Sequence, residues 1–293
     1  MKLIPYKLSI LCFVLLISSS ANTQEFQGKA YYFSKTTMDM SRFNRGGQMS
    51  EQQKKQIEAR MKSWLEKTYI LTFDKEESIF KEDEKLSSPV NGRGSSFFGS
   101  SFSPGAQYKN IKSRTFIQDQ EFFGKQFLIK EDMQPLEWKM GTETKQIGQY
   151  MCFKATAKKV STEIDMSPPK RGNNKRNSDS FNVKDSTNLK EIIKEDETPK
   201  MVDVIAWYTP QIPVSQGPSE YWGLPGLILE VSAGNTVMLC SKIVINPKEK
   251  TEIEAPKKGQ VVTKREYNEI ITKKMEEFRG NRGRSGGRPG GGR

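Results

Sequence analysis

The sequence predicts an α+β fold built on a large, twisted antiparallel sheet with one helix near each end. Many short runs of branched and aromatic residues follow one another across turn-forming residues, as strands of antiparallel sheets do. Helical apolar stripes occur in only two places, near the two ends of the chain. Because strands and helices do not alternate regularly, we do not expect a parallel α/β sheet.

The strand predictions rest on composition and on the turns between the runs. Val202 to Tyr208 is the strongest run, and the turn at Ser232–Asn235 predicts a hairpin between the two strands that flank it. The predicted strands are residues 28–34, 68–73, 78–80, 114–118, 126–130, 137–140, 149–157, 202–208, 227–231 and 236–245.

Both helices have a recognisable first residue. Ser50 with Gln53, and Thr263 with Glu266, have the spacing of a capping box, and Gly280 is the expected stop of the second helix. Each helix carries one apolar stripe, which we expect to face the core. The stripes are Ile57, Met61, Trp64 and Leu65 in the first helix, and Tyr267, Ile270, Ile271, Met275 and Phe278 in the second.

Changes in composition divide the chain into five segments. Residues 24–157 and 201–279 are predicted to form the two parts of a single domain. Between them, residues 158–200 are charged and poor in apolar residues, which predicts a disordered insertion. Residues 280–293 are rich in glycine and arginine and are predicted to be a disordered tail.

The first segment, residues 1–23, has the pattern of a secretory signal. Lys2 and Lys7 precede an apolar run from Leu8 to Ile17, and small residues follow at positions 18–21. The apolar run is shorter than the ~20 residues that a membrane-spanning helix needs. The sequence therefore predicts an exported protein.

Composition also limits the chemistry. The chain contains no histidine, which excludes histidine-dependent triads and histidine-ligated metals. After removal of the signal, Cys152 and Cys240 remain, and a disulfide and two buried thiols are both compatible with the sequence. Asp74, Glu76 and Glu77 could contact calcium, but no EF-type loop follows them. We predict no catalytic residue, no metal and no cofactor.

The net charge of +12 is concentrated toward the C-terminus. The body of the chain is only mildly basic, so no nucleic-acid partner is expected. The arginines near the C-terminus are candidates for contact with an anionic membrane surface, and a merely solvated tail is the alternative. These arginines are Arg279, Arg282, Arg284, Arg288 and Arg293.

Aromatic residues, prolines and glycines are concentrated between residues 207 and 229. Leu224–Leu227 fits a type II turn, with proline at its second position and glycine at its third. One interpretation is a rigid crossover that covers the core; the other is an aromatic rim that binds an apolar ligand, a peptide or a partner protein. The candidate residues are Trp207, Tyr208, Pro210, Pro213, Tyr221, Trp222, Gly223, Leu224, Pro225, Gly226, Leu227 and Ile228.

The run Gly223–Ile228 resembles, letter for letter, the signature of the GLPGLI family of Bacteroidota cell-envelope proteins. Tyr150–Ala157 is similar to the family's Cys-x-Lys-Ala-Thr strand, and Ala206–Pro210 to its Trp-Tyr-Thr segment. Two features depart from the family pattern: the charged insertion, and Ser219 where members often have tryptophan. The strand pattern with flanking helices also resembles the open half-barrel of periplasmic lipoprotein carriers.

The resemblance implies a location and a class of partner. It implies residence in the periplasm or at the periplasmic face of the outer membrane. It also implies an accessory or binding module for an outer-membrane complex of the TonB-dependent receptor type. The half-barrel resemblance implies an alternative, a periplasmic carrier of an apolar ligand such as a lipid or lipopeptide. In both cases we expect a protein that is not an enzyme.

Overall fold

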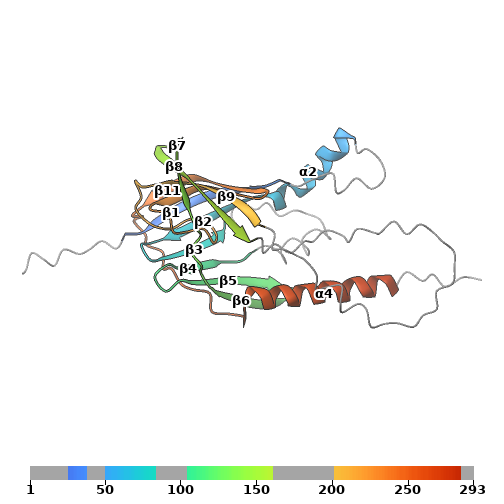
Figure 1. Cartoon of the computed structure of the whole chain (residues 1–293). Coiled ribbons are helices and arrows are strands. Elements are labelled where there is room, and N and C mark those ends of the chain that lie inside the picture. The colour runs from blue at the N-terminus through green and yellow to red at the C-terminus, as the bar shows by residue number, and fades with distance from the viewer. Residues whose placement is uncertain (1–25, 38–49, 84–103, 161–200, 285–293) are drawn as a thin grey trace, which may run out of the picture.

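The structure is a computed structural model that describes residues 26–37, 50–83, 104–160 and 201–284. Within these residues the fold is one twelve-stranded sheet with two helices, α2 (Glu51–Leu65) and α4 (Lys264–Arg284) (Figure 1). The strands are β1 (Gly28–Thr36), β2 (Glu66–Phe73), β3 (Glu77–Glu82), β4 (Gln107–Asn110), β5 (Thr115–Phe122), β6 (Lys125–Asp132), β7 (Lys139–Ile147), β8 (Tyr150–Val160), β9 (Met201–Thr209), β10 (Leu227–Ala233), β11 (Thr236–Ile245) and β12 (Gln260–Val262).

The sheet is open and strongly curved. Its strand order is β12-β6-β5-β4-β3-β2-β1-β11-β10-β9-β8-β7, and every neighbouring pair is antiparallel except β12 with β6. Strands β7 and β12 are the two unclosed edges. Figure 1 shows the sheet turning from β7 and β8 at one side to β5 and β6 at the other, where α4 lies. The predicted α+β fold with a large twisted antiparallel sheet is therefore confirmed.

Each predicted strand overlaps a strand of the structure, but two strands were missed and the ends of two others were misplaced. Strands β4 and β12 were missed because Gln107–Asn110 is polar and Gln260–Val262 is very short. The segment 137–140 overlaps β7 only at Lys139 and Met140, since β7 continues through polar residues to Ile147. Strand β8 continues to Val160, three residues into the segment predicted to be disordered. The rest of that segment, residues 161–200, lies outside the described residues.

Helix α2 begins as predicted and buries its stripe only in part. The capping box is confirmed, because the Ser50 hydroxyl accepts the Gln53 N–H at 3.2 Å and the Gln53 side chain accepts the Ser50 N–H at 3.0 Å. Ile57, Met61 and Leu65 are only half buried. They are nevertheless the least exposed residues of the helix among those whose burial is described, so the predicted stripe is buried in part; α2 extends past the end of the sheet (Figure 1).

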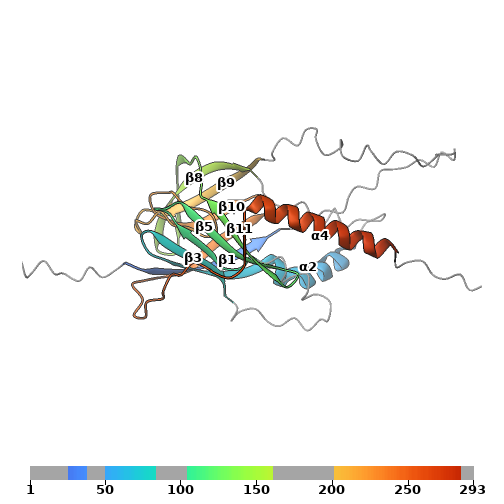
Figure 2. The same ribbon diagram turned by 90° about the horizontal axis from the view of Figure 1, so that it is seen from below.

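Helix α4 packs its first turns on the β6 edge of the sheet. Its predicted cap is confirmed: the Thr263 hydroxyl accepts the Glu266 N–H at 3.2 Å, and the Glu266 carboxylate accepts the Thr263 N–H at 2.8 Å. Tyr267 and Ile271 are buried against β5, β6 and β12. The helix then runs beyond the sheet, at the same end as α2 (Figure 2).

The expected end of α4 was wrong. The helix passes through Gly280 and ends at Arg284, so the predicted tail 280–293 begins inside it. One glycine lowers helix stability by ~1 kcal/mol, which is not enough to stop a helix whose neighbouring residues favour it. Neither of the described helices is long and apolar enough to span a membrane. The predicted signal, residues 1–23, lies outside the described residues.

The connection from β9 to β10 packs into two core clusters. Ile212 and Val214 enter the cluster formed around Tyr32, Leu71 and Phe73 of β1 and β2. Further along the same connection, side chains enter a second cluster, built on β8, β9 and β10. Those side chains are Tyr221 and Leu224, and they pack with Ala155, Val204 and Val231. The segment rich in aromatics and prolines is thus part of the core.

The turn in this connection differs from the type II turn that the sequence predicted. A type II turn needs a positive φ at Gly226, but the positive φ lies at Gly223, at 93°. The Gly226 N–H instead donates to the Leu224 carbonyl at 2.8 Å, across Pro225. Glycine is needed at 226 because a Cβ there would lie 2.2 Å from the carbonyl oxygen of Thr209. The constraint is close backbone approach between the end of β9 and the start of β10.

Replacing Gly226 with alanine should therefore lower the free energy of unfolding by about 2 kcal/mol or more, because the methyl group must displace backbone atoms. Gly141→Ala is the matched control, since its Cβ would lie 3.3 Å from the nearest atom, a carbonyl oxygen at the exposed β7 edge. Urea unfolding would measure both. Equal losses in the two variants would show that close approach at Gly226 is not a constraint.

Candidate ligand-binding site

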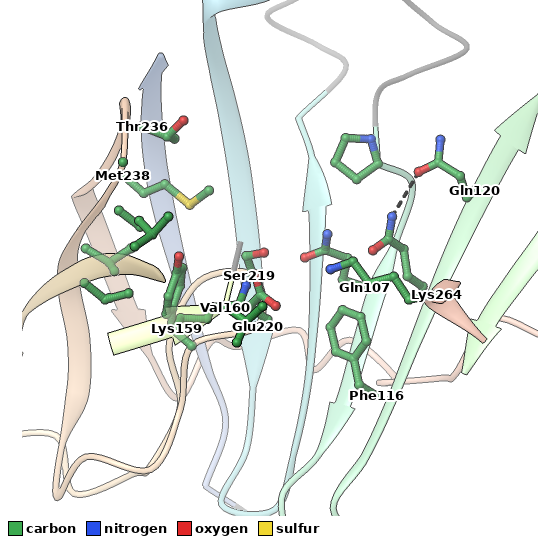
Figure 3. Close-up of a pocket in the computed structure, with 18 of the residues that line it drawn as sticks. Gln107, Phe116, Gln120, Lys159, Val160, Ser219, Glu220, Thr236, Met238 and Lys264 are labelled. Atoms are coloured by element: carbon green, nitrogen blue, oxygen red, sulfur yellow. Dashed lines mark hydrogen bonds and ion pairs between the residues drawn. The ribbon is translucent and has the colours of Figure 1, made fainter. Parts of the chain in front are cut away.

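A cavity of about 550 Å³ lies inside the curve of the sheet. Residues of β4 and β5 form one side, residues of β8 to β11 form the other, and the first turns of α4 complete it. Figure 3 shows Gln107 and Gln120 on one side and Thr236 and Met238 on the other. The volume falls within the ~300–1,000 Å³ that small-molecule sites usually have.

The side formed by β8 to β11 is mainly apolar. Val204 and Val231 are completely or almost completely buried, and Met238 packs against both core clusters. Tyr267 and Ile271 add apolar surface from α4. The remaining apolar residues on this side are Val160, Val202 and Ala233.

The side formed by β4 and β5 carries three glutamines. The Gln118 amide donates to Gln120 Oε1 at 2.9 Å, and the Gln120 amide donates to the Glu121 carbonyl at 3.2 Å. Gln107 is 6% exposed, and its Oε1 has no hydrogen-bond partner among the described residues. Since buried polar atoms are normally paired, this oxygen is a candidate contact for a bound molecule.

A charged group lies in the same cavity. Glu220 pairs with Lys159, and the two side chains keep 36% and 23% of their exposure. Burial alone would raise the pKa of Glu220, but neighbouring lysines outweigh it and hold that pKa below its usual value. In decreasing order of effect these are Lys159, Lys264 and Lys109. Glu220 is therefore a stable carboxylate at neutral pH.

Lys109 joins β4 to the connection between β9 and β10. It projects from β4, is completely buried, and donates from Nζ to the Gly217 carbonyl at 2.5 Å and the Tyr221 carbonyl at 3.1 Å. Burial lowers the pKa of Lys109 to about 7, although the Glu220 charge acts in the opposite direction. The same connection is held at Gln216, whose Oε1 accepts a hydrogen bond from Ser78 at 2.9 Å.

The four aromatic residues predicted as a rim do not form one surface. Tyr221 lines the cavity, whereas Tyr208 packs in the second core cluster and donates to Met140 Sδ at 3.6 Å. Trp207 lies under the amine of Lys145, 4.8 Å from the ring centre. The carbonyl of Trp222 accepts a hydrogen bond from the Trp138 indole at 2.9 Å. Only one of the four contacts the cavity.

The other candidate residues between positions 207 and 229 lie partly in the core and partly on the surface. Leu224, Leu227 and Ile228 are completely buried, and Gly226 is buried by the close backbone approach described above. Exposed positions complete the set: Pro210, Pro213, Gly223 and Pro225. None of these residues lines the cavity.

The candidate residues taken from the sequence do not include the charged residues of the cavity. Lys159 was assigned to the disordered insertion, yet it continues the alternation of Ala155 and Ala157 on β8, both of which face the core. That alternation is the sequence signal that could have found it. Lys264 directly follows the predicted cap of α4. No local sequence pattern shows that β4 and α4 lie next to the connection between β9 and β10.

The two cysteines are free, buried thiols. Both belong to the first core cluster. Burial raises the pKa of Cys152 to about 11 and that of Cys240 to about 12. Of the two alternatives left open by the sequence, the structure contains the pair of thiols, held in their unreactive protonated form.

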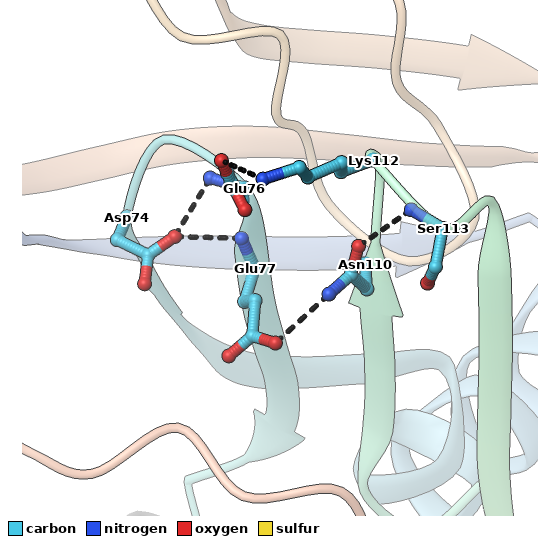
Figure 4. Close-up of polar contacts among 6 residues, drawn as sticks. All are labelled: Asp74, Glu76, Glu77, Asn110, Lys112 and Ser113. Carbon is cyan, nitrogen blue, oxygen red and sulfur yellow. Dashed lines mark hydrogen bonds and ion pairs between the residues drawn. The ribbon is translucent and has the colours of Figure 1, made fainter.

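The acidic turn at Asp74 is a structural element (Figure 4). Its carboxylate accepts the N–H groups of Glu76 at 2.7 Å and Glu77 at 2.6 Å. Lys112 donates to Glu76 at 3.1 Å, and Asn110 donates to Glu77 at 2.9 Å. These contacts join the β2–β3 turn to the end of β4. Across the described ranges no group of three acidic or cysteine side chains is placed to hold a metal ion.

The C-terminal arginines fall partly within α4. The backbone of Arg279, Arg282 and Arg284 is helical, whereas Arg288 and Arg293 lie outside the described residues. Their contact with an anionic surface stays a prediction.

Comparison with known proteins gives a family match and a distant likeness in fold. A family model described as a protein of unknown function (Porph_ging) matches residues 138–230, which include Lys159, Glu220 and the Gly223–Ile228 run. The match is consistent with a cell-envelope family associated with the Bacteroidota, and the finer GLPGLI assignment rests on the sequence resemblance. No curated protein matches the chain significantly.

Two structures of PNGF-II, in different crystal forms, cover 85% and 84% of this chain at 13% and 14% identity, each with a TM-score of 0.45. The chain spans only 33% of their length. At this level the likeness carries no argument about function.

The lowered pKa of Lys109 predicts that stability rises with pH near neutrality. Lys109 keeps its proton in the unfolded chain to about pH 10 but releases it above about pH 7 when folded. Between about pH 7 and pH 8 the unfolded state therefore binds more protons, and the free energy of unfolding increases by up to about 1.4 kcal/mol per unit. Above this window the raised thiol pKa values act in the opposite direction.

Lys109→Met should remove this increase. The measurement is urea unfolding of both proteins at the two ends of that window. The same slope in the variant would show that Lys109 is not the group responsible.

Proposed function

We propose that this protein is an exported, non-enzymatic cell-envelope binding protein that carries an apolar chain, such as that of a lipid or lipopeptide, in its half-open sheet. The observation that carries the proposal is the cavity of about 550 Å³ inside the curve of the sheet. Apolar residues of β9, β10 and β11 form much of one side of this cavity, among them Val204, Val231 and Met238. Burying apolar ligand surface there contributes roughly 25 cal/mol per Å².

The ionisable groups of the cavity favour binding over catalysis. A general acid or base works best with a pKa near the operating pH. Glu220 has a pKa below its usual value and is neutralised by Lys159. Lys109 has a pKa of about 7, but its amine is bonded to two carbonyls and does not line the cavity. The chain has no histidine to supply the missing role.

Filling the cavity should abolish binding without altering the fold. Met238→Trp places a large side chain inside the cavity. The affinity of the protein for a fluorescent fatty-acid probe should therefore fall at least tenfold. Leu239→Trp is the matched control on the same strand, because Leu239 is 40% exposed. If Met238→Trp does not fold, Ala233→Phe fills the same space from β10. A wild-type protein that binds no apolar probe, or variants that bind equally, would contradict the proposal.

A second candidate function is an accessory module of an outer-membrane complex of the TonB-dependent receptor type. It is favoured by a strip of exposed apolar side chains on the outer face of the sheet. Phe33 and Leu239 are direct cross-strand neighbours, and both are 40% exposed. Val237 and Ile205 extend the strip to β9. Exposed apolar groups on neighbouring strands are typical of protein contact surfaces.

A photo-activated cross-linking residue at Leu239 tests this candidate in the native envelope. We expect it to capture an outer-membrane β-barrel receptor, identified by mass spectrometry. The same residue at Lys112, a highly exposed position on the β4–β5 turn, is the control and should not capture it. Absence of a receptor, or equal capture from both positions, would exclude this surface.

A further inference from the structure

The cavity has a charge imbalance at one place on its lining. Its lining carries two lysines, Lys159 and Lys264, and one carboxylate, Glu220. Glu220 makes its ion pair with Lys159. Among the described residues Lys264 has no acidic partner within ion-pair distance, although it contributes to the lowered pKa of Glu220. Within the described part of the chain, one positive charge on the lining is therefore not paired.

Lys264 is the first residue of α4, where the cap formed by Thr263 and Glu266 already offsets the partial positive charge of the helix N-terminus. Asn268, one turn further along the same helix, also lines the cavity. The apolar side lies opposite, so an anion held here would be weakly screened by solvent. The amine of Lys264 is therefore the group that attracts an anion here.

The unpartnered oxygen of Gln107 is an independent observation at this site. Gln107 is 94% buried, as its 6% exposure shows, and it lines the cavity from β4. Its Oε1 accepts no hydrogen bond from the described residues. Because an unmade buried hydrogen bond is costly, a ligand N–H or O–H is the group that would satisfy it.

We propose that the cavity contains a headgroup subsite for an anionic, single-chain amphiphile. In this subsite Lys264, supported by Lys159, binds the carboxylate or phosphate of the headgroup. Gln107 accepts a hydrogen bond from an N–H or O–H donor of the headgroup, such as the amide of an N-acyl amino acid. The apolar chain lies along β9, β10 and β11. This inference rests on the proposed carrier function and specifies the ligand class.

Direct titration with three matched probes tests the subsite. Dodecanoate and dodecyl phosphate carry the two anionic headgroups, and dodecanol carries none. Wild-type protein should bind both anions about tenfold more tightly than dodecanol. Lys264→Met should remove this preference and leave the affinity for dodecanol unchanged. Lys274→Met is the matched control on the exposed side of α4 and should change neither.

The outcomes separate the inference from the function on which it rests. Binding of only one anion supports the subsite and identifies its headgroup as carboxylate or phosphate. Equal wild-type affinity for the anions and dodecanol overturns the subsite but leaves the carrier function intact. An equal loss for all three probes in Lys264→Met also overturns it, because the lysine would then act on the fold. Failure of every probe to bind overturns the carrier function itself.

Gln107 is tested with an added amide donor. Gln107→Leu should weaken binding of N-dodecanoylglycine by about fivefold or more, with a smaller effect on dodecanoate, which lacks the amide. Thermal unfolding of the variant shows whether its fold is retained. An equal loss of affinity for both ligands, or no change for either, would show that Gln107 does not accept a hydrogen bond from the headgroup.

Discussion

The buried amine of Lys109 connects the two arms of the curved sheet. It extends from β4 and donates to the carbonyls of Gly217 and Tyr221, which belong to the connection between β9 and β10. In the sheet these elements are separated by β3, β2, β1 and β11. An open sheet of this width has no hydrogen bond that closes it into a barrel, so contacts across its interior fix its curvature. Removing the proton or the amine changes that contact directly.

The position of the connection between β9 and β10, and with it the shape of the cavity, follows from this contact. Lys109 donates a hydrogen bond to the Gly217 carbonyl of this connection. At its other end, Thr209 approaches Gly226 so closely that no side chain fits at position 226. With the connection fixed, Glu220 enters the cavity beside Lys159, while Leu224 enters the core. The residues of the Gly223–Ile228 signature therefore serve mainly in packing. The residues proposed to recognise a ligand come from strands and a helix that the signature does not include.

Local patterns predicted most elements because each depends on neighbouring residues. Both capping boxes formed as expected, and the alternating and branched runs became strands. Strand β4 was not predicted because its polar Gln107 and its charged Lys109 face the interior. Only tertiary contacts supply hydrogen-bond partners for Lys109 there. The cavity escaped prediction for the same reason. Its lysines, carboxylate and glutamines come from β4, β5, β8, α4 and the β9–β10 connection, which lie far apart in the sequence.

The proposed function depends on an amphiphile that binds in the cavity of the half-open sheet. Native mass spectrometry of the full chain, purified from the envelope of its own host, tests this most directly. We expect an additional mass that is retained under gentle conditions, is released on denaturation and belongs to a single-chain anionic amphiphile. Host-purified protein that consistently shows the mass of the polypeptide alone would show that the cavity does not carry such a ligand.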